Sequence, residues 1–477
     1  MQRILTVAQM READRFTIEN LGVSEKDLVI RAGQAVADEI KKRFFGGRVL
    51  VCVGKGNNGA DGRVVASELS KTHGYTVTVF DVARPVFELL DVKYDIIVDC
   101  IFGTGLNRQV EGDVAKIINK INSSKSYVIS CDIPSGINGD NGQIMGVAVR
   151  ADLTVAIQEY KCGHFLSDGI DYSGEVVARD IGISIWGDDF IKSIGDDDAK
   201  QLFNKRDRNV HKGCFGKAAV IGGSKSFSGA PILSLNALTA LKSGTGYAFL
   251  GVPESIFNAC VGLNPECILT AIKDDGNAVT VDKDALKILM ACDSIAIGMG
   301  MTVCKGVYDL ICYLLDNYTG KLLIDADGLN SLSKFGIDVL KNKKCKVVLT
   351  PHIGEFSRLI GKDKQTLAFD IITPAMAFAK EYGVTLIVKS AVSIITDGNE
   401  VYFNTTGCSG MAKGGSGDVL SGFTAGVLAR TDYLLEAVTV SAYVFGKAGE
   451  IAQKQGCEYT ITASDIVNCL PKAIKSL

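Results

Sequence analysis

Short apolar runs that end at polar or glycine-rich corners recur along this chain, and they constrain its fold more than any other feature. One such run, Arg48–Val53, ends at the corner Gly54–Gly62, and Val64–Thr72 then has helical character. Buried parallel strands are continuously apolar, and helices connect them. The pattern therefore predicts an α/β fold with a parallel sheet. Further runs of this kind are Thr76–Phe80, Tyr94–Asp99, Ser126–Asp132 and Ala151–Ile157.

The chain predicts two domains. Its 477 residues exceed the size of one ordinary domain. The stretch Trp186–Arg208 is charged and weakly apolar, and it separates the first series of strands from a second one. We place the domains at residues 1–195 and 196–477. The second series comprises the strands Lys217–Ser224, Ser294–Gly298, Lys321–Asp325, Val347–Thr350 and Leu386–Lys389, the helix Leu233–Leu241, and a hairpin of Val392–Thr396 with Glu400–Phe403.

Composition excludes several classes of protein. The formal net charge of −3, with no long basic block, argues against nucleic acid as a partner. The fourteen cysteines are scattered singly and only four histidines are present, so a zinc site is not expected and the cysteines read as reduced. The N-terminus lacks the apolar core of a signal peptide, and no apolar run reaches membrane-spanning length. We expect a cytoplasmic protein without a membrane partner.

The segment Asn404–Gly422 carries the strongest chemical signal. Gly414, Gly415, Ser416 and Gly417 lead directly into Asp418 and an apolar helix start. Such a loop directs backbone N–H groups at an anion, and the helix dipole adds to the effect. A carboxylate beside it can take a proton from a hydroxyl group. The segment predicts a phosphoryl-transfer site, although a glycine-rich turn capped by Asp is the structural alternative.

Two further strand ends in the second series are polar. The run Val347–Glu355 ends in a proline turn that carries His352, and Leu386–Lys389 ends in a lysine that could meet a nucleotide phosphate. Ligands of open α/β sheets lie at the carboxyl ends of strands. Polar ends on successive strands therefore favour a ligand site.

The first glycine loop resembles a dinucleotide-binding turn. Gly54–Gly59 fits G-x-G-x-x-G, and Asp81 lies where a ribose-binding carboxylate is expected, which suggests an NAD-dependent dehydrogenase. Against that interpretation, Asn57, Asn58 and Asp61 crowd polar side chains into the loop. A turn that brings backbone close to a pyrophosphate has little use for them, whereas a hard cation or polar ligand does.

Two other corners of the first series match this one. Asp99–Leu106 and Asp132–Asn138 each place a carboxylate at a strand end. Asn58, Asp99 and Ser135 all offer oxygen and could share one cation. Asp132 is the best acid–base candidate in this half.

Together these motifs resemble a known pair of families. NNGADG, DCIFGTGL and DIPSGIN are similar to the NAD(P)H-hydrate epimerase domain. HKGCFGKAAVIGGS, DADGLN, LTPHIGEFSRL and GMAKGGSGDVLSG are similar to the ADP/ATP-dependent NAD(P)H-hydrate dehydratase. The resemblance covers nearly the whole chain, in the order of the bifunctional repair enzymes. It implies a Rossmann-like domain followed by a ribokinase-like domain.

The resemblance also implies a pair of reactions. The first domain would interconvert the R and S hydrates of NAD(P)H (NADHX and NADPHX) and would bind potassium. The second would phosphorylate the hydroxyl group of the S hydrate with ADP or ATP and then expel phosphate, which leaves more readily than hydroxide. Magnesium would be bound mostly through phosphates and water.

Site residues follow from the motif positions. The potassium ligands would be Asn58, Asp99 and Ser135. The hydrate in the first domain would face Asn57, Asn58, Gly59, Ala60, Asp61, Gly103, Thr104, Gly105, Leu106, Asn107, Arg108, Gln109 and Asp132, with Asp132 catalytic. The hydrate in the second domain would face Ala230, Gly300, His352 and Asp418, with Asp418 as the base that deprotonates the hydroxyl group. The nucleotide would contact Lys389, Ser390, Ala391, Val392, Ser393, Gly415, Ser416 and Gly417.

Two other functions stay open at this point. A ribokinase-like kinase of a small molecule would keep Gly415–Asp418, but it would not need the polar corners of the first half. A non-catalytic binding scaffold, as in related domains of RNA turnover, could lose Asn58, Asp99 or Asp132, and all are present. We also expect a homo-oligomer.

Overall fold

The computed structural model describes residues 1–276 and 278–477, which form two compact units. One unit is Arg3–Phe190, and the other comprises Ile191–Leu477 with Met1–Gln2. Among the described residues, no helix is both long enough and apolar enough to cross a bilayer.

The N-terminal unit is built on a parallel sheet with the strand order β3-β2-β4-β5-β6-β8. The five predicted apolar runs form five of its strands, which confirms the α/β class, and β8 was not predicted. The strands are β2 (Gly47–Val53), β3 (Tyr75–Asp81), β4 (Ile96–Cys100), β5 (Tyr127–Cys131), β6 (Leu153–Ile157) and β8 (Glu175–Arg179). Beside them, β1 (Gln2–Leu5) pairs in parallel with β7 (Tyr160–Lys161).

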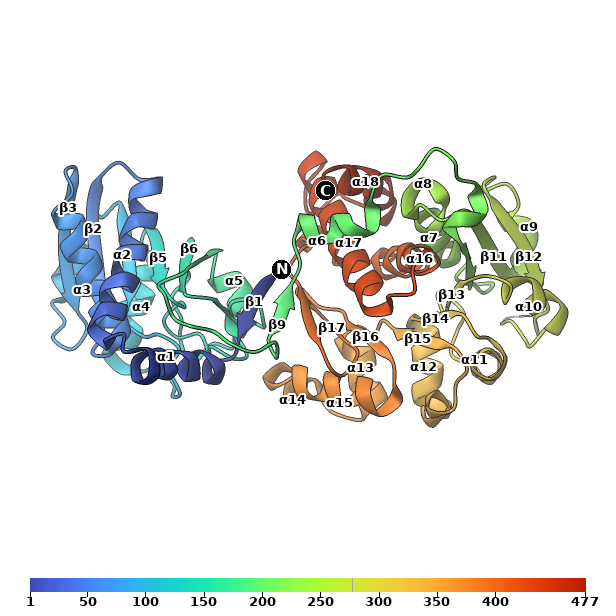
Figure 1. Ribbon diagram of the computed structural model, residues 1–477, viewed down its shortest axis with the longest axis horizontal. Helices are drawn as coiled ribbons and strands as arrows, with labels where there is room; N and C mark the ends of the chain where they lie inside the picture. The colour runs from blue at the N-terminus through green and yellow to red at the C-terminus, as the bar shows by residue number, and fades with distance from the viewer. Residues whose placement is uncertain (277) are drawn as a thin grey trace. The chain divides into compact units, whose positions relative to one another are not determined.

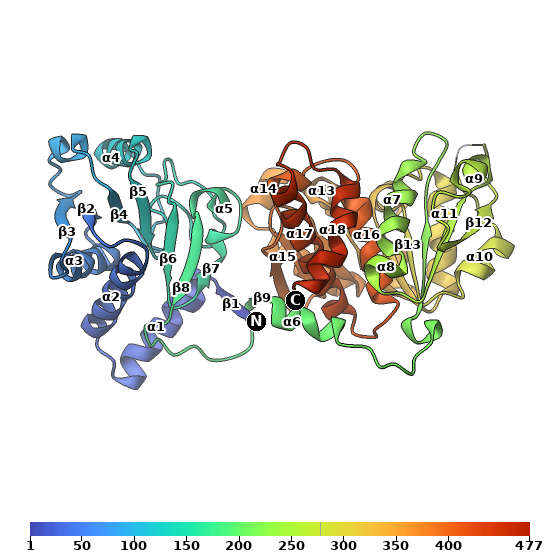
Figure 2. The ribbon, with the colours of Figure 1, turned by 90° about the horizontal axis from the view of Figure 1, so that it is seen from above.

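Helices cover both faces of this sheet (Figure 2). On one face, α1 (Val7–Leu21), α2 (Glu25–Arg43) and α3 (Asn57–Ser70) pack against inward side chains such as Val51 and Val98. On the other face, α4 (Gly112–Ser123) presents Ile117 and Ile121 to the opposite side of the same strands. The alternation of inward and outward residues on each strand thus divides the core into two layers. The short α5 spans Gly169–Tyr172.

Helix α3 begins earlier than the sequence suggests. We predicted a polar loop through Gly62 and a helix from Val64, whereas the helix begins at Asn57. The small residues allow this, because a side chain on Gly59 would overlap the Gly54 carbonyl group. Asn58 and Asp61 therefore lie in the first turns of a helix, which fixes where they point.

The C-terminal unit has a larger mixed sheet, with the order β12-β11-β10-β13-β14-β15-β16-β17-β18-β9. From β12 to β16 the pairs are parallel, and β16–β17 and β17–β18 are antiparallel, which confirms the predicted hairpin. The strands are β9 (Ile191–Ser193), β10 (Lys217–Ile221), β11 (Tyr247–Pro253), β12 (Cys267–Ile272), β13 (Ser294–Ile297), β14 (Lys321–Ile324), β15 (Lys346–Leu349), β16 (Thr385–Val388), β17 (Ser393–Thr396) and β18 (Val401–Asn404).

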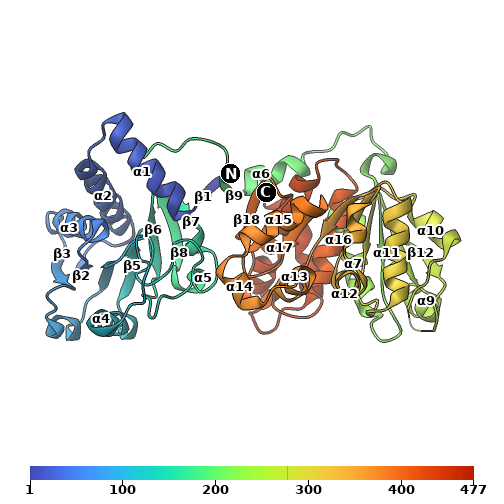
Figure 3. The same ribbon diagram turned by 90° about the horizontal axis from the view of Figure 1, so that it is seen from below.

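This sheet is also covered on both faces (Figures 2 and 3). One face packs on α7 (Gly229–Leu238), α16 (Ser416–Leu428), α17 (Leu434–Gln455) and α18 (Ala463–Lys475). The other face carries α11 (Lys305–Asn317), α12 (Ala326–Phe335), α13 (Ile353–Ile360) and α15 (Ile372–Tyr382). Shorter helices are α6 (Asp196–Lys200), α8 (Ala240–Ser243), α9 (Glu254–Cys260), α10 (Lys283–Leu289) and α14 (Lys364–Phe369).

The helix predicted over Leu233–Leu241 has different limits. Helix α7 begins at Gly229 and ends at Leu238, and α8 follows after Thr239 (Figure 1). In both units the carboxyl ends of the parallel strands carry the polar corners. Each sheet therefore gathers its chemistry along one edge.

Candidate active sites

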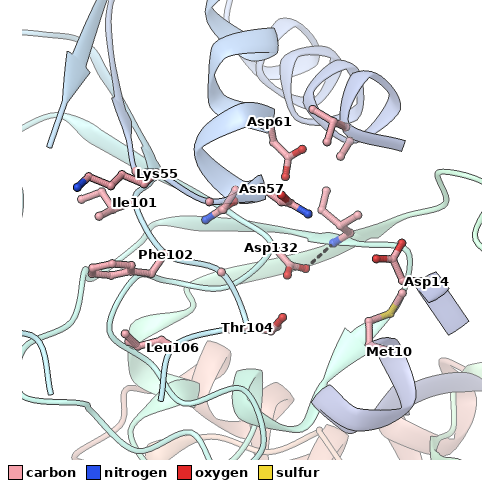
Figure 4. Close-up of a pocket in the computed structure, with 18 of the residues that line it drawn as sticks. Met10, Asp14, Lys55, Asn57, Asp61, Ile101, Phe102, Thr104, Leu106 and Asp132 are labelled. Carbon is pink, nitrogen blue, oxygen red and sulfur yellow. Dashed lines mark hydrogen bonds between the residues drawn. The ribbon is translucent and has the colours of Figure 1, made fainter. Parts of the chain in front are cut away.

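The N-terminal unit contains a cavity of about 820 Å³ at the carboxyl edge of its sheet (Figure 4). Helices α1, α2 and α3 line it together with the loops after β2, β4 and β5. Of the residues expected to face the hydrate, the lining includes Asn57, Asn58, Asp61, Gly103, Thr104, Gly105, Leu106, Asn107, Arg108 and Asp132. Gly59, Ala60 and Gln109 are not among the lining residues.

Asp132 is held rigidly at this cavity. Its backbone has a left-handed φ of 67°, an unfavourable conformation for a residue with a side chain. Oδ1 accepts hydrogen bonds from the Lys161 ammonium group and from the Ile157 N–H, at 3.1 Å for the latter. The hydrogen bonds that the described residues donate to this carboxylate all end on Oδ1, so Oδ2 is left for a ligand.

Two other carboxyl groups share the cavity with Asp132. Burial, followed by the charges of Asp132 and Asp14, raises the pKa of Asp61 to about 8. Burial also raises the pKa of Asp14, and the charge of Glu25 adds to the effect. The site therefore holds a carboxylic acid at neutral pH beside a carboxylate that a lysine stabilises. Pairs of this kind divide acid and base roles between them.

Beneath the cavity, Asp99 is fully buried. Its carboxylate accepts from the Ser130 hydroxyl at 2.9 Å, the Ser135 hydroxyl at 2.5 Å, the Ser135 N–H at 2.8 Å and the Ile101 N–H at 3.2 Å. Burial raises its pKa, and no lysine or arginine among the described residues forms an ion pair with it. A buried carboxylate without a cation is unfavourable, and these donated hydrogen bonds offset part of that cost.

Asn58 has an unsatisfied amide. Both its Oδ1 and its Nδ2 are buried and without a hydrogen-bond partner. A side chain added to Gly103 would contact Asn58, and the neighbouring Phe102 N–H donates to the Ser135 hydroxyl at 2.8 Å. One loop thus connects Asn58 to the Ser135–Asp99 pair. Buried polar atoms without protein partners are rare, and these two remain able to bind a polar group.

Asp81, which suggested a dehydrogenase, and Asn57, which argued against one, both have partners within the protein. Asp81 forms an ion pair with Arg63 and accepts from the Ala83 N–H at 2.9 Å. Asn57 donates to Glu25 at 3.0 Å. These contacts account for both side chains without a dinucleotide, so the resemblance to that turn is local.

In the C-terminal unit, the predicted glycine loop forms the start of α16. Gly415 caps the helix with a φ of 92°, a conformation that suits glycine, and a side chain there would collide with Leu233. Asp418 lies in the first turn. The Ser416 hydroxyl is buried without a partner. The first N–H groups of this thirteen-residue helix are available to an anion.

Lys389 lies beside this loop at the end of β16. Its Nζ donates to Asp325 Oδ1 at 2.7 Å, and it would be 3.3 Å from a Cβ atom on Gly417. Asp325 Oδ2 in turn accepts from the Ser421 hydroxyl of α16 at 2.6 Å. The buried Asp325 therefore fixes both the lysine and the helix that carries the anion loop.

The environment raises the pKa of Asp418 to about 7. Burial is the main cause, and the charge of Asp325 adds to it while Lys389 opposes it. A general base works best when its pKa lies near the working pH. Asp418 has that property and occupies the first turn after the anion loop.

The structure brings the remaining expected hydrate contacts of this unit to the same edge. Gly300, with a φ of 66°, lies against Ala230 at the start of α7. One turn later on α7, the Ser234 hydroxyl donates to the Asp418 carbonyl oxygen at 2.8 Å. His352 forms an isolated parallel bridge with Lys389.

His352 also has a structural role. It caps α13, because Nδ1 accepts from the Gly354 N–H at 2.9 Å and from the Glu355 N–H at 3.3 Å. Burial lowers the His352 pKa, so the neutral ring carries its hydrogen on Nε2. That N–H lies 3.6 Å from Glu355 Oε1, beyond hydrogen-bond distance, and so it can still donate to a ligand.

The segment expected to contact the nucleotide follows Lys389 directly. Ser390 and Ala391 are exposed, and the Ser390 hydroxyl donates to the Val392 carbonyl oxygen at 2.5 Å. Val392 is buried, and Ser393 begins β17. The short exposed turn leaves backbone groups beside the lysine for a ligand.

Two family profiles match this chain. The family described as NAD(P)H-hydrate dehydratase matches residues 218–472. The family described as YjeF-related protein N-terminus matches residues 25–88 and 83–163. The first match covers more than half of the chain and contains each residue of the C-terminal site described above.

Curated relatives extend over both units. The bifunctional NAD(P)H-hydrate repair enzyme of Thermofilum pendens is 33% identical over 100% of this chain and 97% of its own length. That of Dictyoglomus turgidum is 35% identical over 90% of this chain and 89% of its own length. The chain belongs to the family of bifunctional NAD(P)H-hydrate repair enzymes. The resemblance of the sequence motifs to this family is thus confirmed.

Solved structures agree with the family in the C-terminal unit. The ADP/ATP-dependent NAD(P)H-hydrate dehydratase of Bacillus subtilis, crystallised with ATP and Mg²⁺, has a TM-score of 0.51 and 25% identity, and it covers 60% of this chain and 98% of that one. A ribokinase-like protein of Enterococcus faecalis has a TM-score of 0.52 at 23% identity, covering 60% and 96%. The ribokinase-like fold predicted for the second half is confirmed.

Several residues of the sites escaped the sequence analysis. Lys161 and His164 reach Asp132 from a segment with no recognisable ligand motif. Asp325 lies in DADGLN, which was used only as a family motif. Glu355 is buried, and burial raises its pKa to about 7. Spacing alone carries no signal for these contacts, because strand order decides them.

Proposed function

We propose that this chain interconverts the R and S hydrates of NADH and NADPH at the N-terminal cavity. It then converts the S hydrate back to the reduced nucleotide at the C-terminal site, using ADP or ATP. One observation carries the proposal. In the C-terminal unit, Asp418, with a pKa of about 7, lies in the first turn of α16 after the glycine loop. In the N-terminal unit, the cavity holds Asp61, with a pKa of about 8, and Asp132, which is paired with Lys161.

Epimerisation needs an acid and a base. Water adds to an enamine so that the hydroxyl group lies on the carbon next to nitrogen. The nitrogen lone pair can expel that group as water once it is protonated, and water can return to either face. We assign the proton donation to Asp61 and the deprotonation of the incoming water to Oδ2 of Asp132. The raised pKa of Asp61 and the ion pair of Asp132 with Lys161 support these roles.

We propose that Asn58, Asp99 and Ser135 hold a potassium ion. The unpartnered Asn58 amide and the uncompensated Asp99 carboxylate fit a monovalent cation with oxygen ligands. When bound, such an ion supplies the positive charge that the buried Asp99 lacks, and it orders the loop of Phe102 and Gly103 at the cavity.

Dehydration begins with activation of the hydroxyl group. We propose that Asp418 takes its proton while the oxygen attacks the terminal phosphoryl group of the nucleotide. The N–H groups of Gly415, Ser416 and Gly417 would hold the phosphoryl oxygens, and Lys389 would add its charge beside them. Ser390, Ala391, Val392 and Ser393 would line the nucleotide, and Ala230, Gly300 and His352 the hydrate.

Elimination completes the repair. Phosphate departs with the C–O electron pair as the nitrogen lone pair forms a C=N bond, and loss of a proton from the adjacent carbon restores the enamine. Magnesium would enter with the nucleotide phosphates, since the described residues contain no group of three or more His, Cys, Asp or Glu side chains placed to hold a metal ion.

Phosphorus NMR tests the dehydration scheme. Incubating the protein with S hydrate, ADP and Mg²⁺ should give AMP and inorganic phosphate in proportion to the NADH regenerated. Without the hydrate, ADP should persist. Regeneration of NADH without consumption of nucleotide would refute the scheme, and accumulation of a stable phosphorylated hydrate would show a kinase that does not eliminate.

A further inference from the structure

Lys161 is a buried charge to which the proposed reactions give no chemical step. Its side chain is 1% exposed. Among the described residues, it is one of the largest side chains that are almost fully buried. The ammonium group donates to Asp132 Oδ1 and, at 2.6 Å, to the Ile157 carbonyl oxygen. Lys161 is among the residues that line the cavity. Because a buried ammonium group is unfavourable unless it is paired, this arrangement needs an explanation.

The segment that carries Lys161 also contacts Asp132 through His164. The Lys161 N–H donates to His164 Nδ1 at 3.0 Å, and His164 Nε2 lies 2.8 Å from the Asp132 carbonyl oxygen. Since Nδ1 accepts, Nε2 carries the hydrogen and donates. Burial lowers the His164 pKa to about 4, so the ring is neutral. β7 and the 3₁₀ turn Cys162–His164 thus hold both the side chain and the backbone of Asp132.

Asp132 needs such a grip. Its left-handed backbone is secured on the other side by its own N–H, which donates to the Val155 carbonyl oxygen at 2.8 Å. The Ile157 N–H and the Lys161 ammonium group both end on Oδ1. The carboxylate is thereby oriented with one oxygen anchored and the other free at the cavity.

We propose that Lys161 is a positioning residue for epimerisation: it anchors Oδ1 of Asp132 and compensates its charge, so that Oδ2 acts as the base. The inference rests on the function proposed above and adds a residue to the same site. His164 shares the positioning role but contributes no charge. Lys161 contributes both a hydrogen bond that anchors Asp132 and a positive charge that compensates it.

The charges around the cavity make this compensation necessary. Asp61 approaches from α3 and Asp14 from α1, and the charge of Asp132 already acts on Asp61. Without Lys161, the Asp132 carboxylate would face two other carboxyl groups, and its protonated form would be favoured. The titratable and charged groups that line the cavity beside Asp132 are Arg11 and Asp14 of α1, Glu25 of α2, Lys55 before α3, Asp61 of α3, Arg108 after β4 and Lys161 of β7. The neutral His164 is not a lining residue and contacts the Asp132 backbone.

The test uses the full chain and a mixture of R and S hydrates with ADP and Mg²⁺. The S hydrate present at the start is consumed in a fast phase, and the following slow phase reports epimerisation above the spontaneous rate. The variants are Lys161→Met, Lys161→Arg and His164→Ala. Lys116→Met is the matched control, because it removes the lysine of an exposed pair with Asp113 in the same unit. Fluorescence of Trp186, the single tryptophan, reports whether the N-terminal unit is folded.

We expect Lys161→Met to slow the second phase by about 10-fold or more and to move its acid limb upward by about 1–3 pH units. His164→Ala should slow that phase without moving the limb. Lys161→Arg should keep the limb at the wild-type position even where its rate falls. Lys116→Met should match the wild type in both respects.

Three outcomes would overturn the inference. The first is a slow phase in Lys161→Met that has the wild-type rate. The second is a slower phase in that variant whose acid limb stays at the wild-type pH, and the third is an acid limb in Lys161→Arg that moves as far as in Lys161→Met. If Lys161→Met does not fold, the arginine variant and His164→Ala decide the question. A wild-type protein without a second phase would instead refute the proposed epimerisation itself.

Discussion

Lys389 donates a 2.7 Å hydrogen bond to Asp325, and this pair connects the nucleotide segment to the helix that carries the proposed base. The other oxygen of Asp325 accepts from Ser421 of α16 at 2.6 Å. The negative charge of Asp325 also contributes to the raised pKa of Asp418. The buried Asp325 carboxylate thus orients Lys389 and raises the pKa of Asp418.

Asp325→Asn should lower the pKa of Asp418, because it removes a negative charge and frees the positive charge of Lys389. The acid limb of kcat/KM for dehydration of the S hydrate, near pH 7 in the wild type, should move to lower pH. Asp309→Asn, which breaks an exposed pair with Lys305 in the same unit, is the control. An acid limb that stays in place or moves upward would contradict this coupling.

Asp418→Asn should reduce dehydration by about 100-fold or more, since a general base contributes that much. Epimerisation should continue, because Asp132 lies in the other unit. Loss of S hydrate measures the first activity, and exchange of R and S hydrates separated by chromatography measures the second. If the variant still consumes ADP with the hydrate at the wild-type rate, Asp418 is not the base.

Asp132→Ala should leave repair of the S hydrate at the wild-type rate and halt use of the R hydrate. The recovery of NADPH from a mixture should therefore stop once the initial S hydrate is exhausted. Turnover of the R hydrate above the spontaneous rate in this variant would remove Asp132 from the proposed reaction.

Asp61 gives epimerisation an alkaline limb. Its pKa of about 8 means that the proton it is proposed to donate is present below that pH and is lost above it. The rate of R-hydrate use should fall as the pH rises through about 8. Asp61→Asn should lower the rate by about 100-fold or more and abolish this limb. A wild-type rate that is flat to pH 9.5 would show that another group supplies the proton.

Gly59 fixes the close start of α3. A side chain there would overlap the Gly54 carbonyl group, so Gly59→Ala should lower the free energy of unfolding by about 1–3 kcal/mol. Gly56→Ala is the matched control for stability, because a side chain on Gly56 meets no atom within 4 Å and its φ is −90°. Urea unfolding followed by Trp186 fluorescence measures both. Equal stabilities of the two variants would contradict the packing described here.

The sequence predicts the fold class and the glycine loop at the start of α16 well, and the physical reason is local. Continuous apolar runs specify buried parallel strands, and Gly414–Asp418 specifies its own conformation at a helix start. The predicted start of α3 was wrong because the composition of Asn57–Gly62 is typical of a loop. Close packing of Gly59 on Gly54 allows a helix there instead.

The contacts that hold Asp132 and Asp325 at the two sites were not predictable. Lys161 reaches Asp132, and Lys389 reaches Asp325, only because the strands place distant segments side by side. The side-chain amide of Asn58 was recognised as a candidate ligand from the residue type, but its burial without partners is visible only in the folded chain. Residue type suggests chemistry, and strand order decides which groups meet.

Absorbance at the reduced-nicotinamide band, recorded on a mixture of R and S NADPH hydrates with and without ADP and Mg²⁺, tests the central claim most directly. Two activities on one chain predict full recovery of NADPH that depends on the nucleotide. The part of the NADPH recovery that comes from the R hydrate should be faster than spontaneous epimerisation. Recovery that stops when the initial S hydrate is spent would contradict the role of the N-terminal cavity, and no recovery with either ADP or ATP would contradict the whole account.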